Sequence, residues 1–294
     1  MSRRYVLMFF LWMMSYAASA EEPLKVMLDW LPNPDQAPLF VAKEAGIFTK
    51  HGVEVTLFNP SDVSDSAKMV AIGKMDIAIT YQPSWVMQKS QGLPLVWIGN
   101  LIDQPLACVI ADGGQGVKLL SDLNHKTIGY SSGAVDSLVL ARMLAFHGIS
   151  LKTVNLLNVH YNLNQALLTH RVAGVSGAMR NVELIELKAL GFPAKAFYPE
   201  QNGVPPYAEL IFVAEAQKAQ APRMKAFMAS ITDAIIFLKA HPDAAWQLLI
   251  KHHPELDTPT NFKIFQATIP YFADRPSHFD QAQNDRLTQF LTAK

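Results

Sequence analysis

The sequence predicts an α/β protein of two lobes, with mostly parallel sheets, helices on both faces and a C-terminal helical coat. Short runs rich in Val and Ile alternate with segments of helical period, which is typical of parallel sheets covered on both faces. The 294-residue chain, half of it apolar, is long enough to bury more than one core, which favours two lobes. From Ala221 onward the pattern is helical only, which predicts a helical layer over the first lobe.

The elements follow from apolar spacing and from turn residues. A first strand ends near Trp30 and breaks at Pro32-Asn33-Pro34, and a helix is predicted from Pro38 to Ala45, ended by Gly46. The later strands are short apolar runs, predicted at 53–57, 77–80, 96–101, 106–110, 127–130, 154–160, 172–178 and 209–214. The helices between them are predicted at 64–72, 84–91, 137–147, 163–169 and 181–190. In the C-terminal coat one helix is predicted at 232–240, and another begins at His241-Pro242-Asp243.

The first twenty residues have the pattern of a cleavable export signal. Arg3 and Arg4 form a charged start, residues 5–14 an apolar run, and Ala18-Ser19-Ala20 a small-residue cleavage site. We therefore expect residues 1–20 to be a signal peptide that is cleaved after Ala20 when the chain is exported. No Cys follows the cleavage site, which argues against a lipid anchor.

Composition excludes several classes of protein and site. The chain has 25 basic and 25 acidic side chains, a balance that argues against a nucleic-acid or membrane-surface protein. The single Cys108 excludes an internal disulfide and a cysteine zinc site. Cys108 lies in an apolar strand, which favours a buried inert thiol over the alternative of a nucleophile. The scattered histidines show no ligand spacing, so we expect no metal.

Two turn-rich stretches divide the chain, one at 111–118 with Gly113-Gly114 and one at 201–206 with Pro205-Pro206. These breaks predict lobe one at residues 21–111 plus 207–294, and lobe two at residues 112–206. A chain that passes from one lobe to the other and back forms a two-stranded hinge, and we expect a cleft between the lobes. Because ligands of open α/β sheets bind outside the carboxyl ends of the strands, we expect the loop after Trp30 to border this cleft. An exported chain with such a loop suggests an extracytoplasmic binding protein.

Three segments resemble a known family: Asp29-Trp30-Leu31-Pro32-Asn33 with the following Gly46-Ile47-Phe48 and Gly52-Val53-Glu54-Val55; Asn181-Val182-Glu183; and Pro199 to Leu210. The chain resembles the thiamine-pyrimidine-precursor proteins, which include the ThiY-type binding proteins of ABC importers and the yeast-type pyrimidine synthases. The resemblance covers residues 24–294. It implies a type II-like periplasmic-binding-protein fold, a periplasmic location and an aminopyrimidine ligand clamped between the lobes. It also implies an ABC permease and its ATPase as partners, and we expect a monomer.

The synthases of this family use a lysine-bound pyridoxal phosphate and consume one of their own histidines. This chain has Thr80 where the resemblance places the lysine and Ser84 where it places the histidine, and the region of the synthase cysteine cluster contains no Cys. We therefore expect no enzymatic activity and no cofactor. Relatives often carry His where this chain has Gln36, so the ligand is expected to differ in detail.

A flat heteroaromatic ligand needs aromatic faces to stack on and polar groups at its edges. The candidate aromatic contacts lie at or beside predicted strand ends: Trp30, Tyr81, Trp85 and Tyr207. The candidate polar contacts are Asn33, Asn181, Glu183 and Glu209. Each also has an alternative structural role: Asn33 as a turn residue, Asn181 as a helix cap, and the two glutamates as solvated acids. The backbone of Ser131, Ser132 and Gly133, between a strand and a helix, is a further candidate.

Rival interpretations use other residues. Gly129-Tyr130-Ser131-Ser132-Gly133 matches the nucleophile elbow of serine hydrolases, whose histidine would be His241, His252, His253 or His278. An alkanesulfonate-like anion is the alternative ligand, and Arg142 or Arg180 would bind it through paired N–H groups. For both arginines the alternative is a structural ion pair.

Overall fold

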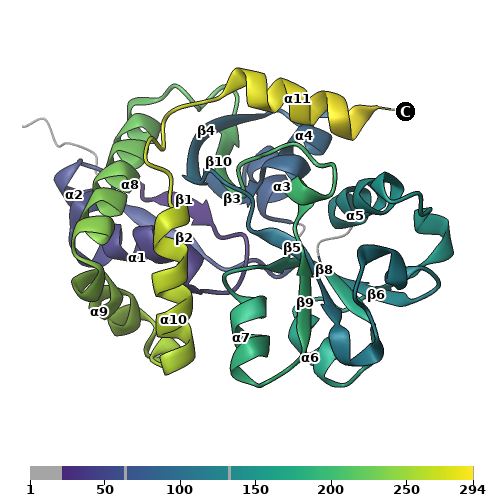
Figure 1. Ribbon diagram of the computed structural model, residues 1–294. Coiled ribbons are helices and arrows are strands. Elements are labelled where there is room, and N and C mark those ends of the chain that lie inside the picture. Colours follow the sequence, from purple (N-terminus) through teal and green to yellow (C-terminus); the bar gives the residue numbers. More distant parts are fainter. Residues whose placement is uncertain (1–21, 63–64, 132–133, 294) are drawn as a thin grey trace, which may run out of the picture.

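Two five-stranded sheets organise the computed structural model, which describes residues 22–62, 65–131 and 134–293 (Figure 1). The first sheet has the order β2-β1-β3-β10-β4. Its strands are β1 (Leu24–Met27), β2 (Val55–Phe58), β3 (Ile77–Tyr81), β4 (Leu95–Ile102) and β10 (Leu210–Glu215). The second sheet has the order β7-β6-β8-β5-β9. Its strands are β5 (Ala107–Asp112), β6 (Thr127–Tyr130), β7 (Asn155–Asn158), β8 (Gly174–Met179) and β9 (Ala194–Phe197). The predicted signal peptide lies outside the described residues.

Each sheet contains one reversed strand. In the first sheet β1 is parallel to β2 and β3, and β10 is antiparallel to both of its neighbours, β3 and β4. In the second sheet β6 is parallel to β7 and β8, whereas β5 is antiparallel to β8 and β9. Strands β5 and β10 are the first strands after each passage of the chain between the sheets. The predicted α/β architecture is therefore confirmed, and both sheets are mixed, with four strands in one direction and one reversed.

The chain passes between the sheets twice, once between β4 and β5 and once between β9 and β10. We call the part built on the first sheet lobe one and the part built on the second sheet lobe two. The boundary expected at residue 111 is wrong, because it falls inside β5, which pairs with β8 and β9 of lobe two. The turn at Gly113–Gln115 that suggested this boundary lies within lobe two. The expected break at 201–206 lies within the second crossing.

Helices cover both sheets (Figure 1). Those of lobe one before the crossing are α1 (Ala37–Glu44), α2 (Ile47–Lys50), α3 (Ser66–Ala71) and α4 (Gln82–Ser90). Those of lobe two are α5 (Ala134–Phe146), α6 (Leu163–Leu168) and α7 (Glu183–Ala189). The C-terminal helices are α8 (Pro222–Ala240), α9 (Pro242–His252), α10 (Pro259–Thr268) and α11 (Gln281–Thr292).

The C-terminal coat covers lobe one, as the sequence predicts. Helices α8 and α9 pack on α1, and α11 packs on α4. Helix α8 begins ten residues before the predicted 232, because Pro222 at its first turn is preorganised for a helix. Phe227, Ile231 and Leu238 bury one face of α8 in the core of lobe one. Helix α10 also contacts α7, so the coat reaches lobe two.

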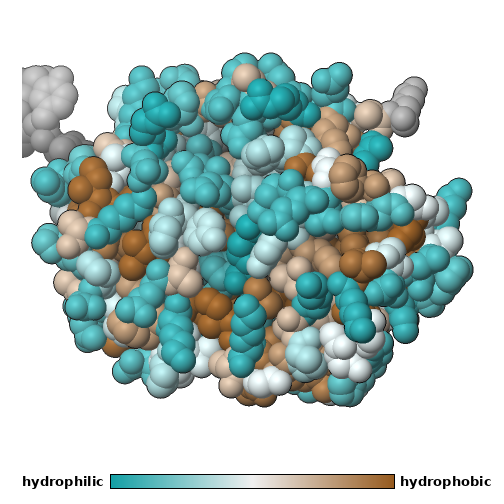
Figure 2. All heavy atoms as spheres, viewed as in Figure 1, coloured by the Kyte–Doolittle hydropathy of each residue, from teal (hydrophilic) through white to brown (hydrophobic). Residues whose placement is uncertain are grey.

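The face of the molecule in Figure 2 is mainly hydrophilic, with small apolar patches scattered over both lobes. None of the helices in the described part of the chain has the length and apolar character needed to cross a bilayer.

Candidate functional site

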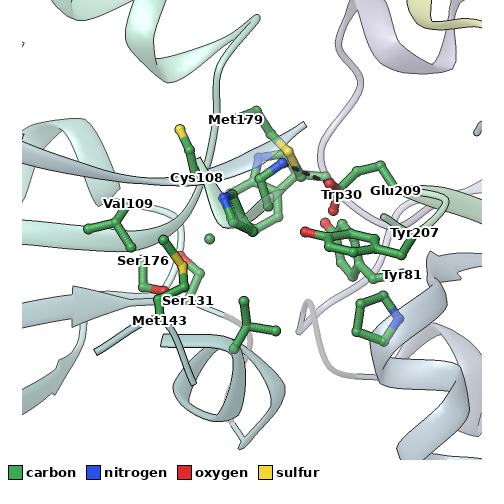
Figure 3. Close-up of a pocket in the computed structure, with 15 residues that line it drawn as sticks. Trp30, Tyr81, Cys108, Val109, Ser131, Met143, Ser176, Met179, Tyr207 and Glu209 are labelled. Atoms are coloured by element: carbon green, nitrogen blue, oxygen red, sulfur yellow. Dashed lines mark hydrogen bonds between the residues drawn. The ribbon is translucent and has the colours of Figure 1, made fainter. Parts of the chain in front are cut away.

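A pocket lies between the two lobes, and we call it the ring pocket (Figure 3). Lobe one and the second crossing contribute Trp30, Tyr81, Tyr207 and Glu209. Lobe two contributes Ser131, Ser176, Met143 and Met179, which face the aromatic side chains from the opposite side. Five of the residues predicted from the sequence as ligand contacts therefore border one space, namely Trp30, Tyr81, Ser131, Tyr207 and Glu209.

The aromatic wall stands at the carboxyl ends of neighbouring parallel strands. Trp30 follows β1, and Tyr81 is the last residue of β3, so both reach the same edge of the sheet. Tyr207 precedes β10, which enters beside β3, and its side chain is buried. The order of the strands in lobe one thus brings three aromatic side chains together from three distant parts of the sequence.

Asp29 fixes one edge of this wall. Its carboxylate accepts hydrogen bonds from Tyr81 Oη at 3.2 Å and from Gln36 Nε2 at 2.9 Å. Burial raises the pKa of Asp29 above its ordinary value. Gln36 is fully buried and lines neither this pocket nor the neighbouring cavity. The side chain of Gln36 therefore acts on the two cavities through its partners, Asp29 and the backbone of Asn33.

Asn33 shapes the loop after β1. Its Oδ1 accepts a hydrogen bond from the backbone N–H of Asp35 at 2.8 Å, and its Nδ2 donates to the carbonyl of Leu31. The short helical turn Pro34–Gln36 is thereby capped. Both ends of the Asn33 amide are used inside the loop, so the structure favours its role in the turn.

Glu209 connects the ring pocket to the hinge. Its side chain is buried, and its Oε2 accepts hydrogen bonds from the backbone N–H groups of Leu106 and Ala107, at 2.6 and 2.7 Å. These two residues end the first crossing, whereas Glu209 ends the second. One carboxylate therefore ties the two crossings together beside the pocket.

On the opposite wall, Ser131 directly follows β6 and donates a hydrogen bond to the main-chain carbonyl of His160. The serine hydrolase interpretation requires an imidazole at this hydroxyl. In the described structure the imidazole of His252 instead pairs with Glu44 at the end of α1, and that of His253 pairs with Glu255 in the coat of lobe one. Residues Ser132 and Gly133, predicted as backbone contacts, lie outside the described residues.

A second cavity adjoins the ring pocket and shares Trp30, Tyr81, Gly177 and Met179 with it. We call it the acidic cavity, because its lining includes Asp29, Asp35, Glu183 and Glu186. Burial, together with the charge of Asp29, raises the pKa of Asp35 to about 7. Burial also raises the pKa of Glu183 to about 7, although its Oε2 accepts a hydrogen bond from the backbone of Met179.

Two predicted contacts lie away from both cavities. Trp85 is in the core of lobe one, 2% exposed, and its indole N–H donates to the carbonyl of Leu95. Asn181 is buried between the lobes, where its amide donates to Asp35 and Thr268. Helix α7 begins at Glu183 rather than at Asn181, so Asn181 does not cap it.

Neither arginine of the anion hypothesis lines the two cavities. The guanidinium of Arg180 forms a paired hydrogen bond with the carboxylate of Glu200, at 2.6 and 2.9 Å, and stacks over Tyr198. Arg142 donates to the carbonyl of Ala293 and lies over Phe290. For Arg180 the structure thus shows the alternative role, a structural ion pair, with Glu200 as the partner.

No reactive group is supplied to the ring pocket by Cys108, or by Thr80 and Ser84, which occupy the positions of the lysine and histidine of the synthases. Burial raises the pKa of the Cys108 thiol, whose sulfur points away from the aromatic side chains in Figure 3. Thr80 is buried in β3, and Ser84 is on α4. Among the described residues that line the two cavities there is no Lys or His. The residues present therefore do not fit a lysine-bound pyridoxal phosphate.

Several residues of the site were missed from the sequence. Ser176 and Gly177 lie in the middle of β8, opposite a register shift in β5, and Gly177 has a φ of 81°. A glycine inside a strand pattern is the signal of such an irregularity. Tyr161 and Asp35 approach from loops of opposite lobes, so their proximity has no local signal.

Comparison with known proteins gives the family. The model described as "NMT1/THI5 like" matches residues 33–245. A protein of Haemophilus influenzae with the name "Putative thiamine biosynthesis protein" is 38% identical over 96% of this chain and 90% of its own length. The formylaminopyrimidine-binding protein of Halalkalibacterium halodurans is 30% identical, over 82% of this chain and 73% of its own. The 4-amino-5-hydroxymethyl-2-methylpyrimidine phosphate synthase of Legionella pneumophila is 24% identical, over 87% and 82%.

Solved structures share the fold. The alkanesulfonate-binding protein SsuA of Xanthomonas axonopodis superposes with a TM-score of 0.72 at 16% identity, over 91% of this chain and 90% of its own. The periplasmic aliphatic sulphonate-binding protein SsuA of Escherichia coli superposes with a TM-score of 0.71 at 13% identity, over 92% and 85%. The fold is therefore that of periplasmic binding proteins, and the sequence match shows that the chain belongs to the NMT1/THI5-like family.

Proposed function

We propose that this protein is an extracytoplasmic solute-binding protein that captures a thiamine-precursor aminopyrimidine between its lobes and delivers it to an ABC permease. The observation that carries this proposal is the ring pocket, in which three aromatic side chains from lobe one and the second crossing face hydroxyl groups of lobe two. A flat ring stacks on such aromatic faces, and polar groups at the rim fix its orientation. The names of two relatives, a formylaminopyrimidine-binding protein and a thiamine biosynthesis protein, support the same ligand class.

The polar atoms around the pocket match an aminopyrimidine. Carboxylate and hydroxyl oxygens of Glu209, Ser131 and Ser176 border the space, and such oxygens accept hydrogen bonds from exocyclic amino groups. No Arg or Lys is among the described residues that line the ring pocket or the acidic cavity. A sulfonate or phosphate would therefore be desolvated without a cationic partner, which disfavours the alkanesulfonate alternative.

In this proposal the protein performs no chemistry. Thr80 and Ser84 stand in place of the groups that the synthases use, and a binding protein needs only a cleft that opens and closes. Cleavage of residues 1–20 would release a monomer outside the cytoplasm, where closure around the ligand presents both lobes to the permease and its ATPase. The periplasmic location of structural neighbours such as SsuA of Escherichia coli supports this assignment.

Calorimetry of the chain from residue 21 tests the proposal. We expect a formylated aminomethylpyrimidine to bind with one site per chain, and pyridoxal phosphate and the sulfonate MOPS to give no heat. A protein that binds MOPS and not the pyrimidine would contradict the ligand assignment. Pyrimidine consumption or release of a phosphorylated product would contradict the assignment as a binding protein.

A further inference from the structure

Asn181 makes a buried hydrogen-bonded bridge between the two lobes. It lies in lobe two, between β8 and α7, and it is 2% exposed. Its Nδ2 donates to Asp35 Oδ1 at 2.6 Å and to Thr268 Oγ1 at 2.8 Å. Asp35 lies in the turn before α1, and Thr268 ends α10, so both partners belong to lobe one.

Each pair of residues in the bridge is in contact. Thr268 Oγ1 lies 3.1 Å from Asp35 Oδ1, and Thr268 and Asp35 are buried like Asn181. The helices that carry or neighbour these residues, α7 and α10, contact each other across the lobes. Hydrogen bonds out of water are electrostatically stronger than those at the surface, which makes this a stable contact between the two lobes.

The bridge exists only when the lobes are together, and it does not involve the ring pocket. None of its three residues lines the ring pocket, and of the three only Asp35 borders the acidic cavity. If the lobes rotate apart at the crossings, the amide of Asn181 leaves Asp35 and Thr268, and all three groups meet water. The bridge therefore contributes free energy to the closed arrangement alone, whichever ligand occupies the ring pocket.

We propose that Asn181, Asp35 and Thr268 form a closure latch, and that Asn181 is a positioning residue that sets the balance between the closed and open lobes. This inference rests on the proposed binding function for its effect on affinity. Its effect on lobe closure is independent of the ligand's identity. A latch that favours the binding-competent closed state raises the apparent affinity for every ligand by the same factor.

Asn181→Asp is the sharpest variant, because it keeps the shape of the side chain and replaces the donor by an oxygen that faces the carboxylate of Asp35. Asn181→Ala removes both bonds from the side of lobe two, and Thr268→Val removes one of the two from the side of lobe one, so the latch stays testable if one variant does not fold. The control is Asn124→Ala, which removes an amide bonded to Thr153 inside lobe two. X-ray scattering of the unliganded protein measures closure, and stopped-flow kinetics with a series of aminopyrimidines measures binding.

We expect the latch variants to have a larger radius of gyration than the wild type and Asn124→Ala. We expect the dissociation rate to rise roughly tenfold, by the same factor for every pyrimidine in the series. A factor that changes with the substituent of the pyrimidine would show direct ligand contact and overturn the latch. An unchanged radius of gyration would also overturn it. If the wild type binds no aminopyrimidine, the proposed function fails, and the scattering experiment still decides on the latch.

Discussion

Trp30 of lobe one meets Tyr161 of lobe two edge to face, with ring centroids 4.7 Å apart and the ring planes at 67°. Trp30 also lines both the ring pocket and the acidic cavity, whereas Tyr161 lines the acidic cavity alone. An edge-to-face aromatic pair between two lobes fixes the position of one ring on the other. The indole is thus held in place from the far lobe while it borders the ligand space.

The first prediction concerns Trp30. Trp30→Ala removes both the stacking surface and the contact with Tyr161, so we expect the dissociation constant for an aminopyrimidine to rise at least tenfold, or about 1.4 kcal/mol. Tyr161→Phe keeps the ring and should bind within about threefold of the wild type. Calorimetry on both variants measures the difference. Normal binding by Trp30→Ala would remove Trp30 from the site.

The second prediction separates the pocket tryptophan from the core tryptophan. Trp85 is fully packed in lobe one, so Trp85→Ala should lower the free energy of unfolding by about 3–5 kcal/mol. The folded fraction should bind the pyrimidine with nearly the wild-type affinity, because Trp85 does not line the ring pocket. Urea unfolding and calorimetry on the same sample check both statements. A large loss of affinity at wild-type stability would mean that Trp85 contacts the ligand.

The contrast between these residues shows what the sequence can predict. Trp30 follows β1, and the rule that ligands bind outside the carboxyl ends of strands is enough to place it at the cleft. Tyr207 precedes β10 and reaches the same edge because β10 is antiparallel to β3. Trp85 is on a helix just after such an end, where the sequence does not reveal which face turns to the core. Asn181 was expected to cap a helix or face the ligand, but its partners are 146 and 87 residues away along the chain.

The lobe boundary predicted at residue 111 is wrong for a related reason. Gly113 and Gly114 give a strong local turn signal, and the sequence places the crossing there. The structure shows that β5, just before this turn, inserts between β8 and β9. Pairing partners of a strand are set by the whole sheet, so the alternation of elements predicted the architecture and left the point of crossing undetermined.

The third prediction concerns Glu209 at the hinge. Glu209→Gln keeps one oxygen acceptor but loses the charge that strengthens the bonds from the backbone of Leu106 and Ala107. We expect the free energy of unfolding to fall by about 1.5–3 kcal/mol, and the affinity for the pyrimidine to fall with it. Glu215→Gln is the matched control, because Glu215 is at the far end of β10 and pairs with Lys218. Equal stability of the two variants would contradict a role for Glu209 in the crossings.

The last prediction concerns the pH dependence that Asp35 gives to stability. Burial, and then the charge of Asp29, raises the pKa of Asp35 from its ordinary value of 3.8 to about 7. Between these two values the folded protein keeps a proton that the unfolded chain has lost, so the contribution of Asp35 to stability falls as the pH rises through this window. Above the folded pKa it is constant. Glu183 acts in the same direction, since burial also raises its pKa to about 7.

Asp35→Asn removes this titration and keeps an oxygen that accepts from Asn181. We therefore expect the stability of the wild type relative to Asp35→Asn to decrease steadily from about pH 4 to about pH 7 and then to level off. Urea unfolding of both proteins across this range gives the difference directly and cancels the carboxylates whose pKa values are lowered, such as Asp112 and Asp274. A difference that grows with pH would mean that Asp35 is stabilised as an anion in the folded protein.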